Sequence, residues 1–215
     1  MATSGSTSSN APRRSSISPT DAARRRARHV VARRAMTEIL LDPVAIARGL
    51  RRVAGEITEH GGVRDLALIG IRRGGEPLAE RLSALLRELE GEAPPVGSID
   101  ITLYRDDAAT ALPSPKIGPS RIPFDVRGKR VLLVDDVIFT GRTIRAAFDA
   151  VLDYGRPRRI ELFTLVDRGG RELPIHPDYT VRRVEVAPGR RIEVATREGE
   201  LWATIEEAGP KEVSS

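Results

Sequence analysis

Apolar positions at helical spacing mark the first helix of the chain. The stretch 39–62 is predicted to be a helix, with Asp42 capping its amino end and Pro43 in the first turn. Its apolar positions fall on one face and are expected to be buried: Val44, Ala47, Leu50, Val53, Ala54 and Ile57. Gly61 and Gly62 are expected to end the helix, because glycine readily adopts the left-handed conformation found after a last helical turn.

Apolar-rich stretches predict the strands of a sheet. A short continuous apolar run occupies 66–71, and further strands are predicted over 98–104, the stretch KRVLLVDD and 158–167. Runs without alternation are typical of strands that are buried on both faces. Roughly the last forty residues add two β-type pieces, TVRRVEV and RRIEVAT.

Two more amphipathic helices lie between these strands. One is predicted over 76–91, with Leu78, Leu82, Leu85 and Leu89 facing inward. The other is TIRAAFDAVLDYG, which ends at Gly155, with Ile144, Ala147, Phe148, Val151 and Leu152 facing inward. Strands separated by helices predict an α/β domain with a central parallel sheet flanked by helices. Ligands of such sheets bind outside the carboxyl ends of the strands.

Composition excludes several kinds of site. The 215 residues are enough for one domain with a real core, and they include no cysteine, which rules out disulfides, thiol nucleophiles and thiolate metal sites. The histidines, His29, His60 and His176, lie far apart, so no protein metal site is expected. No apolar run approaches the length that spans a bilayer, so no membrane partner is expected.

The positive charge is concentrated in the amino-terminal 36 residues. Residues 1–36 hold eight arginines and one acid, Asp21, whereas 37–215 carry 27 basic and 29 acidic residues. The division predicts a disordered Arg/Ser-rich tail over 1–36 and a nearly neutral domain over 37–215. An organelle transit peptide and a phosphate-binding arm are two other interpretations of the tail.

The stretch VLLVDDVIFTGRT, which spans 131–143, carries the chemistry. Asp135 and Asp136 stand at the carboxyl end of an apolar strand, and alternation along a strand predicts that their side chains point to opposite sides. Thr140, Gly141, Arg142 and Thr143 then lead into a helix, whose first amides are unpaired and attract an anion, a phosphate above all. The Walker pattern is absent, so nucleoside triphosphate hydrolysis is not predicted. A phosphate site beside two carboxylates suggests a sugar phosphate.

This stretch resembles the phosphoribosyl-pyrophosphate (PRPP) signature of type I phosphoribosyltransferases. Three further stretches narrow the resemblance: GSIDITLYRDD, the residues 121–157, and LVDRGGRELPIHPDY. Together they resemble the PyrR family of pyrimidine operon attenuation regulators, which are also uracil phosphoribosyltransferases. The resemblance covers about 38–205 and implies the type I phosphoribosyltransferase fold with a small hood.

The resemblance also implies a reaction and a set of site residues. Uracil and PRPP would give UMP and pyrophosphate, with Mg²⁺ accompanying PRPP and with catalysis by positioning and charge stabilisation. Asp135, Asp136 and Arg105 are the expected catalytic residues. The expected contacts of PRPP and UMP are Arg72, Arg73, Gly74, Asp135, Asp136, Val137, Ile138, Phe139, Thr140, Gly141, Arg142, Thr143, Arg168 and Val194. The polar loop 105–121, with Lys116 as a second cation, is expected to close over PRPP.

The resemblance implies partners as well, with some departures from the family pattern. A pyr mRNA leader, a homodimer or higher homo-oligomer and a cytoplasmic location would follow from it. The expected RNA contacts are Arg51, Arg52 and Arg171. However, a threonine is expected near Arg51 and histidines at Gly55 and Gly170, and Thr-Arg-Gly is expected where this chain has Arg73-Gly74-Gly75. A solvated arginine cluster, a salt-bridged turn at DRGGRE and a transferase for another base remain open.

Overall fold

A parallel sheet of five strands forms the centre of the part of the chain that the structure describes. The computed structural model describes residues 37–104 and 118–208. The strands run in the order β3-β2-β4-β5-β6, with every neighbouring pair parallel. Their bounds are Val96–Ile99, Leu66–Ile71, Arg130–Ile138, Arg159–Asp167 and Tyr179–Arg183. The prediction of a parallel α/β sheet is confirmed.

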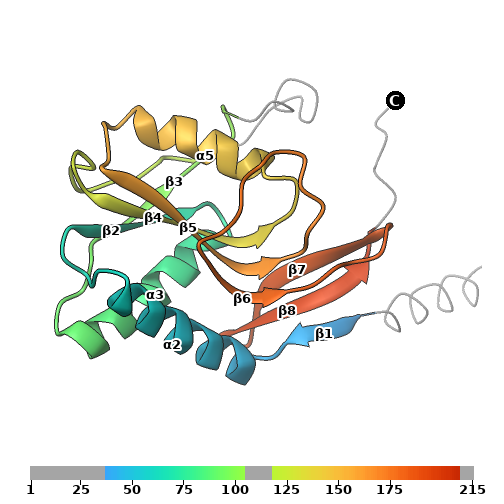
Figure 1. The fold of residues 1–215 in the computed structure, drawn as a ribbon. Coiled ribbons are helices and arrows are strands. Elements are labelled where there is room, and N and C mark those ends of the chain that lie inside the picture. The colour runs from blue at the N-terminus through green and yellow to red at the C-terminus, as the bar shows by residue number, and fades with distance from the viewer. Residues whose placement is uncertain (1–36, 105–117, 209–215) are drawn as a thin grey trace, which may run out of the picture. The chain divides into compact units, whose positions relative to one another are not determined.

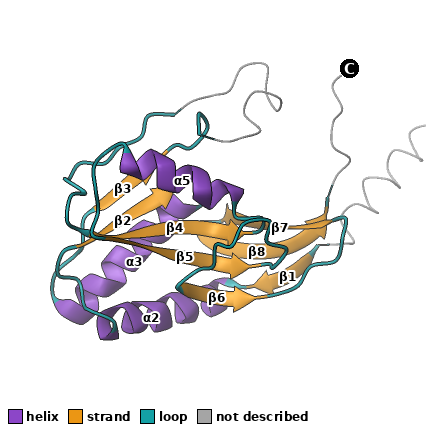
Figure 2. Ribbon diagram, turned by 45° about the horizontal axis from the view of Figure 1, so that its top comes forward, coloured by secondary structure: helices purple, strands orange, loops and turns teal. Residues whose placement is uncertain are grey.

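Helices cover both faces of this sheet (Figures 1 and 2). The helices α2 (Pro43–Glu59) and α3 (Gly75–Glu90) lie on one face, and α5 (Arg142–Leu152) lies on the other. Alternate residues of β4 divide between the two cores. Leu132 and Val134 pack with α2 and α3, whereas Val131 and Leu133 pack with α5.

Helix α2 begins after Asp42, which the sequence predicts as its cap, whereas the buried faces of the helices are narrower than predicted. Asp42 caps α2 through a hydrogen bond of 2.7 Å from the Ala45 amide to its carboxylate. Four residues predicted to face inward are exposed, namely Val44 (74%), Leu89 (48%), Leu152 (52%) and Ala47. Val44 and Ala47 lie near the start of α2, and Leu89 and Leu152 lie in the last turns of α3 and α5. The buried stripe of α2 is centred instead on Ile46, Leu50, Val53 and Ile57.

A second, antiparallel sheet forms the hood. Its order is β1-β8-β7, with bounds Glu38–Leu41, Glu200–Glu207 and Arg190–Arg197. The prediction that 39–41 begin a helix is wrong. These residues form a strand that pairs with β8, near the other end of the described chain. Val194, on β7, is partly buried against the core beneath α2 and α3.

The strand β3 is shorter than the predicted 98–104. It ends at Ile99 because the next residue, Asp100, turns the chain: its carboxylate accepts hydrogen bonds from the amides of Thr102 (2.8 Å) and Gly118 (2.7 Å). The predicted tail, together with Arg105 and Lys116, lies outside the described residues. In the described part of the chain, no helix combines the length and the apolar character needed to cross a bilayer.

Candidate active site

Three segments meet at the carboxyl edge of the parallel sheet. They follow β2 at 72–74, β4 at 139–142 and β5 at 168–171. In a parallel sheet the carboxyl ends of neighbouring strands lie side by side, which brings these segments together. Most of the residues predicted to contact PRPP lie on these segments. Asp135 and Asp136 lie near the carboxyl end of β4 itself.

Asp135 and Asp136 are carboxylates held in low-dielectric surroundings. Asp135 is 5% exposed and Asp136 is half-buried, and each accepts a hydrogen bond from the amide that follows it, at 3.1 and 2.7 Å. Burial, followed by the charge of Asp136, raises the pKa of Asp135 well above its ordinary value. Burial also raises the pKa of Asp136. Among the described residues, neither carboxylate forms an ion pair, so the local negative charge is uncompensated.

Two glycines let the turn after β2 lie directly against these acids. A Cβ at Gly74 would come within 2.1 Å of an Oδ atom of Asp136, and one at Gly75 within 1.9 Å of the Val134 carbonyl oxygen. Any side chain at either position would displace β4 or its carboxylates. The glycines therefore join the 72–74 turn to the acids, a role that sequence reasoning did not assign to Gly75.

The amino end of α5 presents backbone amides beside the acids. Gly141, the residue before α5, has a φ of 91°, a conformation that favours glycine, and the Thr140 hydroxyl accepts a hydrogen bond of 3.4 Å from the Arg142 amide in the first turn. The Thr140 carbonyl accepts hydrogen bonds from the amides of Glu172 and Leu173, at 2.9 and 3.1 Å, and fixes the loop. Arg142 donates from Nε to Glu172 at 2.6 Å. Thr143 is half-buried in the same turn.

Phe139 and Arg168 form a stacked pair at this edge. The guanidinium carbon of Arg168 lies 4.0 Å from the centre of the Phe139 ring, whose residue is 44% exposed. Burial lowers the pKa of Arg168. A Cβ at Gly170 would lie 2.4 Å from the same ring, so the ring covers the position where the family pattern has histidine. Val137 and Ile138 complete β4 beneath them.

The largely buried side chain of Arg171 stabilises the turn that follows β5. Its side chain is 13% exposed and pairs with Asp167 at 2.6 Å. It also donates to the carbonyls of Phe139 (2.7 Å), Ile175 (2.8 Å) and Gly169 (3.2 Å). These contacts match the salt-bridged turn that the sequence left open, and they favour a structural role. RNA binding by Arg171 stays a prediction.

The two arginines after β2 have different surroundings. Arg72 donates from Nη1 to the Pro119 carbonyl at 2.9 Å, and its own amide donates to Ile99 at the same distance. Arg73 is exposed. The peptide bond between Arg72 and Arg73 is cis.

A cavity of about 290 Å³ lies between the end of β5 and the segment after β6. It is lined by Asp167, Gly169, Arg183, Val184 and Glu185. None of the last three residues was singled out as a site residue from the sequence, because no motif marks them and only the fold brings them to β5. The Val184 amide donates to the Asp167 carbonyl at 2.9 Å. Val194 lines the hood core and not this cavity.

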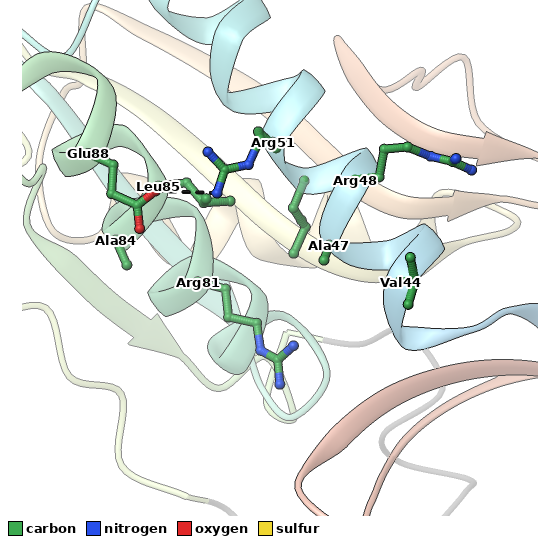
Figure 3. Close-up of a pocket in the computed structure, with 9 residues that line it drawn as sticks. Val44, Ala47, Arg48, Arg51, Arg81, Ala84, Leu85 and Glu88 are labelled. Atoms are coloured by element: carbon green, nitrogen blue, oxygen red, sulfur yellow. Dashed lines mark hydrogen bonds and ion pairs between the residues drawn. The ribbon is translucent and has the colours of Figure 1, made fainter.

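A separate groove of about 570 Å³ runs between α2 and α3 (Figure 3). Arg48, Arg51 and Arg81 stand on its walls around Val44, Ala47 and Leu85. Figure 3 shows Arg51 reaching toward Glu88, with which it pairs at 3.4 Å. Arg52 pairs with Glu56 and donates to the Thr180 carbonyl at 2.8 Å. Both predicted RNA-binding arginines of α2 are thus exposed but engaged within the chain.

The fold and this carboxyl-edge site define a phosphoribosyltransferase domain. Residues 36–194 match the family model described as the phosphoribosyl transferase domain. The fold is shared with a hypoxanthine-guanine phosphoribosyltransferase of Bacillus anthracis (TM-score 0.56, 18% identity, 72% of this chain and 86% of that chain). It is also shared with a Trypanosoma cruzi hypoxanthine phosphoribosyltransferase in complex with its product IMP (TM-score 0.55, 21% identity, 70% and 77%).

Sequence relatives identify the family within this class. The Bifunctional protein PyrR of Chloroflexus aurantiacus is 51% identical over 160 residues, which cover 74% of this chain and 88% of the relative. The Bifunctional protein PyrR of a Roseiflexus species is 54% identical over 159 residues, which cover 74% and 86%. The chain belongs to the PyrR family of phosphoribosyltransferases, and the resemblance read from the sequence is confirmed.

Proposed function

We propose that this phosphoribosyltransferase transfers the phosphoribosyl group of PRPP to uracil, giving UMP and pyrophosphate. The observation that carries the proposal is the buried pair Asp135 and Asp136, without a cation among the described residues, beside the amino end of α5. Two acids and the backbone amides at a helix amino end are complementary to a sugar phosphate, whose hydroxyls donate and whose phosphate accepts.

The reaction needs stabilisation of charge more than a covalent nucleophile. The bond from C1′ of the ribose to the pyrophosphate oxygen breaks, a bond from C1′ to a uracil nitrogen forms, and that nitrogen loses its proton. Positive charge develops on the ribose in between, and Asp135 and Asp136 are placed to stabilise it through its hydroxyls. The amides of 141–143 and the Thr140 hydroxyl hold the 5′-phosphate, and Arg73 meets the pyrophosphate. Arg105 keeps its predicted role on the departing pyrophosphate, outside the described residues.

Mg²⁺ fits this donor set as a companion of PRPP. Within the described ranges, no group of three or more acidic or histidine side chains is arranged to hold a metal. Carboxylate oxygens are ligands that Mg²⁺ prefers, and the ion usually keeps waters and substrate phosphates in its shell. Asp135 and Asp136 would therefore hold it through water or substrate. The bound ion would neutralise charge on the leaving pyrophosphate.

We place the base in the cavity at the end of β5. The cavity is lined by the backbone of 183–185, whose groups not already paired with β5 suit the imide edge of uracil, and Phe139 with Arg168 forms an aromatic and cationic wall nearby. The names of the curated relatives support a pyrimidine role. A purine acceptor is the outcome that would replace uracil in this proposal.

Regulation by RNA is the second half of the proposal. The relatives are named bifunctional, and Arg51 and Arg52 are exposed on α2 with Arg48 beside them. We propose that uridine-nucleotide-dependent binding of a pyr mRNA leader uses this arginine-bearing face, with transcriptional attenuation as the result. A gel shift against the leader of the chain's own pyrimidine operon tests it. Equal affinity for scrambled RNA, with and without UMP, would remove RNA regulation from the proposal.

A radiolabelled uracil-to-UMP assay with Mg²⁺ and PRPP tests the enzyme proposal. Labelled UMP is expected only when all three components are present. The same assay with hypoxanthine, guanine and adenine in place of uracil measures base selectivity. Turnover of a purine without turnover of uracil would overturn the uracil assignment and leave the transferase class intact.

A further inference from the structure

Asp100, the first residue after β3, ties together segments that are distant in sequence. Its carboxylate accepts one hydrogen bond from the Thr102 amide (2.8 Å) and one from the Gly118 amide (2.7 Å), and its own amide donates to the Ser120 hydroxyl (3.0 Å). Ser98 and Arg121 form an antiparallel bridge just beyond, with both amide-to-carbonyl distances at 2.8 Å. The chain that leaves β3 is thereby fastened to the chain that returns.

Arg72 belongs to the same assembly. Its amide donates to the Ile99 carbonyl and its Nη1 to the Pro119 carbonyl, both at 2.9 Å. A Cβ at Gly118 would lie 3.0 Å from the Asp100 carboxylate and 3.3 Å from the guanidinium carbon of Arg72. The Asp100 carboxylate and the Arg72 guanidinium therefore border the same glycine, and the turn after β2 is fixed to the segment after β3.

The charges of this assembly are balanced. Burial acts to raise the pKa of Asp100, but hydrogen bonds from Thr102 and Gly118 and the charge of Arg72 outweigh it, so the pKa is lowered. Asp100 is thus an anion at neutral pH. Without Arg72 beside it, this carboxylate would repel an anionic ligand at the same edge of the sheet.

We propose that Asp100 is a positioning residue for pyrophosphate: by binding the Gly118 amide it fixes the neighbouring Pro119 carbonyl, which accepts the Arg72 guanidinium, so that Arg73 and the 73–75 amides face the ligand. This inference rests on the proposed function and divides the work between two adjacent arginines. Arg72 stabilises the turn after β2 through its hydrogen bonds to the carbonyls of Ile99 and Pro119. Arg73 is exposed and supplies the cation that faces the ligand. It precedes Gly74, where the Asp136 carboxylate leaves no room for a side chain.

Asp100→Asn in the full chain tests the proposal. An asparagine keeps one acceptor but turns an NH₂ group toward one of the two amides, so one hydrogen bond is lost and the 118–119 segment that binds Arg72 is less well fixed. We expect affinity for pyrophosphate with Mg²⁺, measured by calorimetry, to fall about tenfold, or ~1.4 kcal/mol. Affinity for UMP, which lacks pyrophosphate, should change less than about twofold.

Asp125→Asn is the matched control. The Asp125 carboxylate also accepts from the amide two residues on, Arg127, at 2.9 Å, but it is exposed and outside the site. Neither ligand should lose affinity in this variant. Arg72→Met should reproduce the selective loss, and the double variant Asp100→Asn/Arg72→Met should be no weaker than the single ones, because both remove the same anchor.

Several results would overturn the inference. Unchanged pyrophosphate affinity in both single variants, no pyrophosphate binding by the wild type, or equal losses for pyrophosphate and UMP would each do so. If Asp100→Asn does not fold, Arg72→Met alone decides between a selective and a general loss. The proposed function is tested separately, because a wild type that binds pyrophosphate but makes no UMP would contradict the uracil assignment and leave the role of Asp100 standing.

Discussion

The two ends of β4 carry buried charges that are handled in opposite ways. At the amino end, Arg130 pairs with Glu161 of β5 at 3.3 Å, and their side chains are only 6% and 2% exposed. At the carboxyl end, Asp135 and Asp136 are buried or half-buried side by side without a cation among the described residues. The same strand thus begins with a compensated charge and ends with an uncompensated one.

The amino end is closed on all sides by protein. Arg159 pairs with the second oxygen of Glu161 at 3.2 Å, and the Tyr179 hydroxyl lies 3.5 Å from the first. A Cβ at Gly61 would lie 2.6 Å from Nη1 of Arg130, so the chain after α2 packs directly on the guanidinium. The charges of this cluster are paired with one another within the chain and do not depend on a ligand.

The difference separates structural charges from functional ones. Buried charges that are paired within the chain hold the fold, and breaking one pair destabilises it. Buried charges of one sign that the chain leaves unpaired are unfavourable in the free protein and become favourable when a ligand supplies the other sign. Substitutions at the two ends of β4 should therefore have opposite effects on stability and on activity.

The largest expected effect is the loss of catalysis at the carboxyl end. Asp136→Asn combined with Thr140→Ala removes a ribose contact and a phosphate donor, and kcat/KM for PRPP should fall about a thousandfold. The free energy of unfolding should stay equal or rise, since an uncompensated buried charge is removed. Steady-state kinetics and urea unfolding measure the two quantities.

Near-normal kcat/KM in this double variant would show that the ligand binds elsewhere. Arg145→Gln is a suitable control, because Arg145 pairs with Asp149 on the exposed face of the same helix, α5, at 2.6 Å. Its kinetics should match the wild type.

The second effect belongs to the amino end and concerns stability. Glu161→Gln leaves Arg130 buried without its full counter-charge and should lower the free energy of unfolding by about 3 kcal/mol. Asp149→Asn, which breaks an exposed pair, should lower it by less than about 0.5 kcal/mol. At a temperature where all three proteins are folded, kcat/KM for PRPP should be the same.

Replacing both partners sharpens this test. Arg130→Met with Glu161→Leu removes the pair and its desolvation together, so most of the lost stability should return. A Glu161→Gln variant that is as stable as the wild type but inactive would reverse the comparison and make the amino end part of the site.

Local patterns were enough to predict the centre of the fold. The apolar run 66–71 coincides with β2, and Asp42 and Pro43 begin α2 as expected, because these signals depend on neighbours in sequence. The strand β1 was missed for the opposite reason. Its four residues pair with β8, where Glu38 lies opposite Ile205, and no local pattern reports a partner so far along the chain.

The site divides in the same way. The acids and the TGRT turn stand in one continuous stretch, so the residue types and their spacing were sufficient to predict an anion site. The reason for Gly75, which touches the carbonyl of Val134, exists only after β2 and β4 pair. The cavity residues Arg183, Val184 and Glu185 likewise depend on the pairing of β5 with β6.

A third, smaller effect is expected where the turn after β2 touches the acids. Gly74→Ala places a methyl group where the Asp136 carboxylate now lies, at 2.1 Å, so the carboxylate must move. We expect kcat/KM for PRPP to fall about tenfold, whereas the free energy of unfolding should change little. Gly55→Ala is the matched control: a Cβ there meets nothing within 4 Å, and alanine in a helix should stabilise slightly, by about 0.5–1 kcal/mol. Equal kinetics in both variants would mean that Gly74 does not position Asp136.

The smallest effect is a pH dependence that belongs to the carboxyl end alone. Burial raises the pKa of Asp135 and Asp136 above the ordinary 3.8, so the folded chain binds protons more tightly than the unfolded chain. Their contribution to stability is therefore full below pH 3.8 and is lost as the pH rises through the raised pKa values. The urea midpoint of the wild type minus that of Asp135→Asn should fall with rising pH across this window. Taking the difference removes the contribution of groups that titrate alike in both proteins. Mg²⁺ with PRPP should flatten the difference by favouring the charged acids, and a difference that is flat without ligand would mean that the acids are compensated after all.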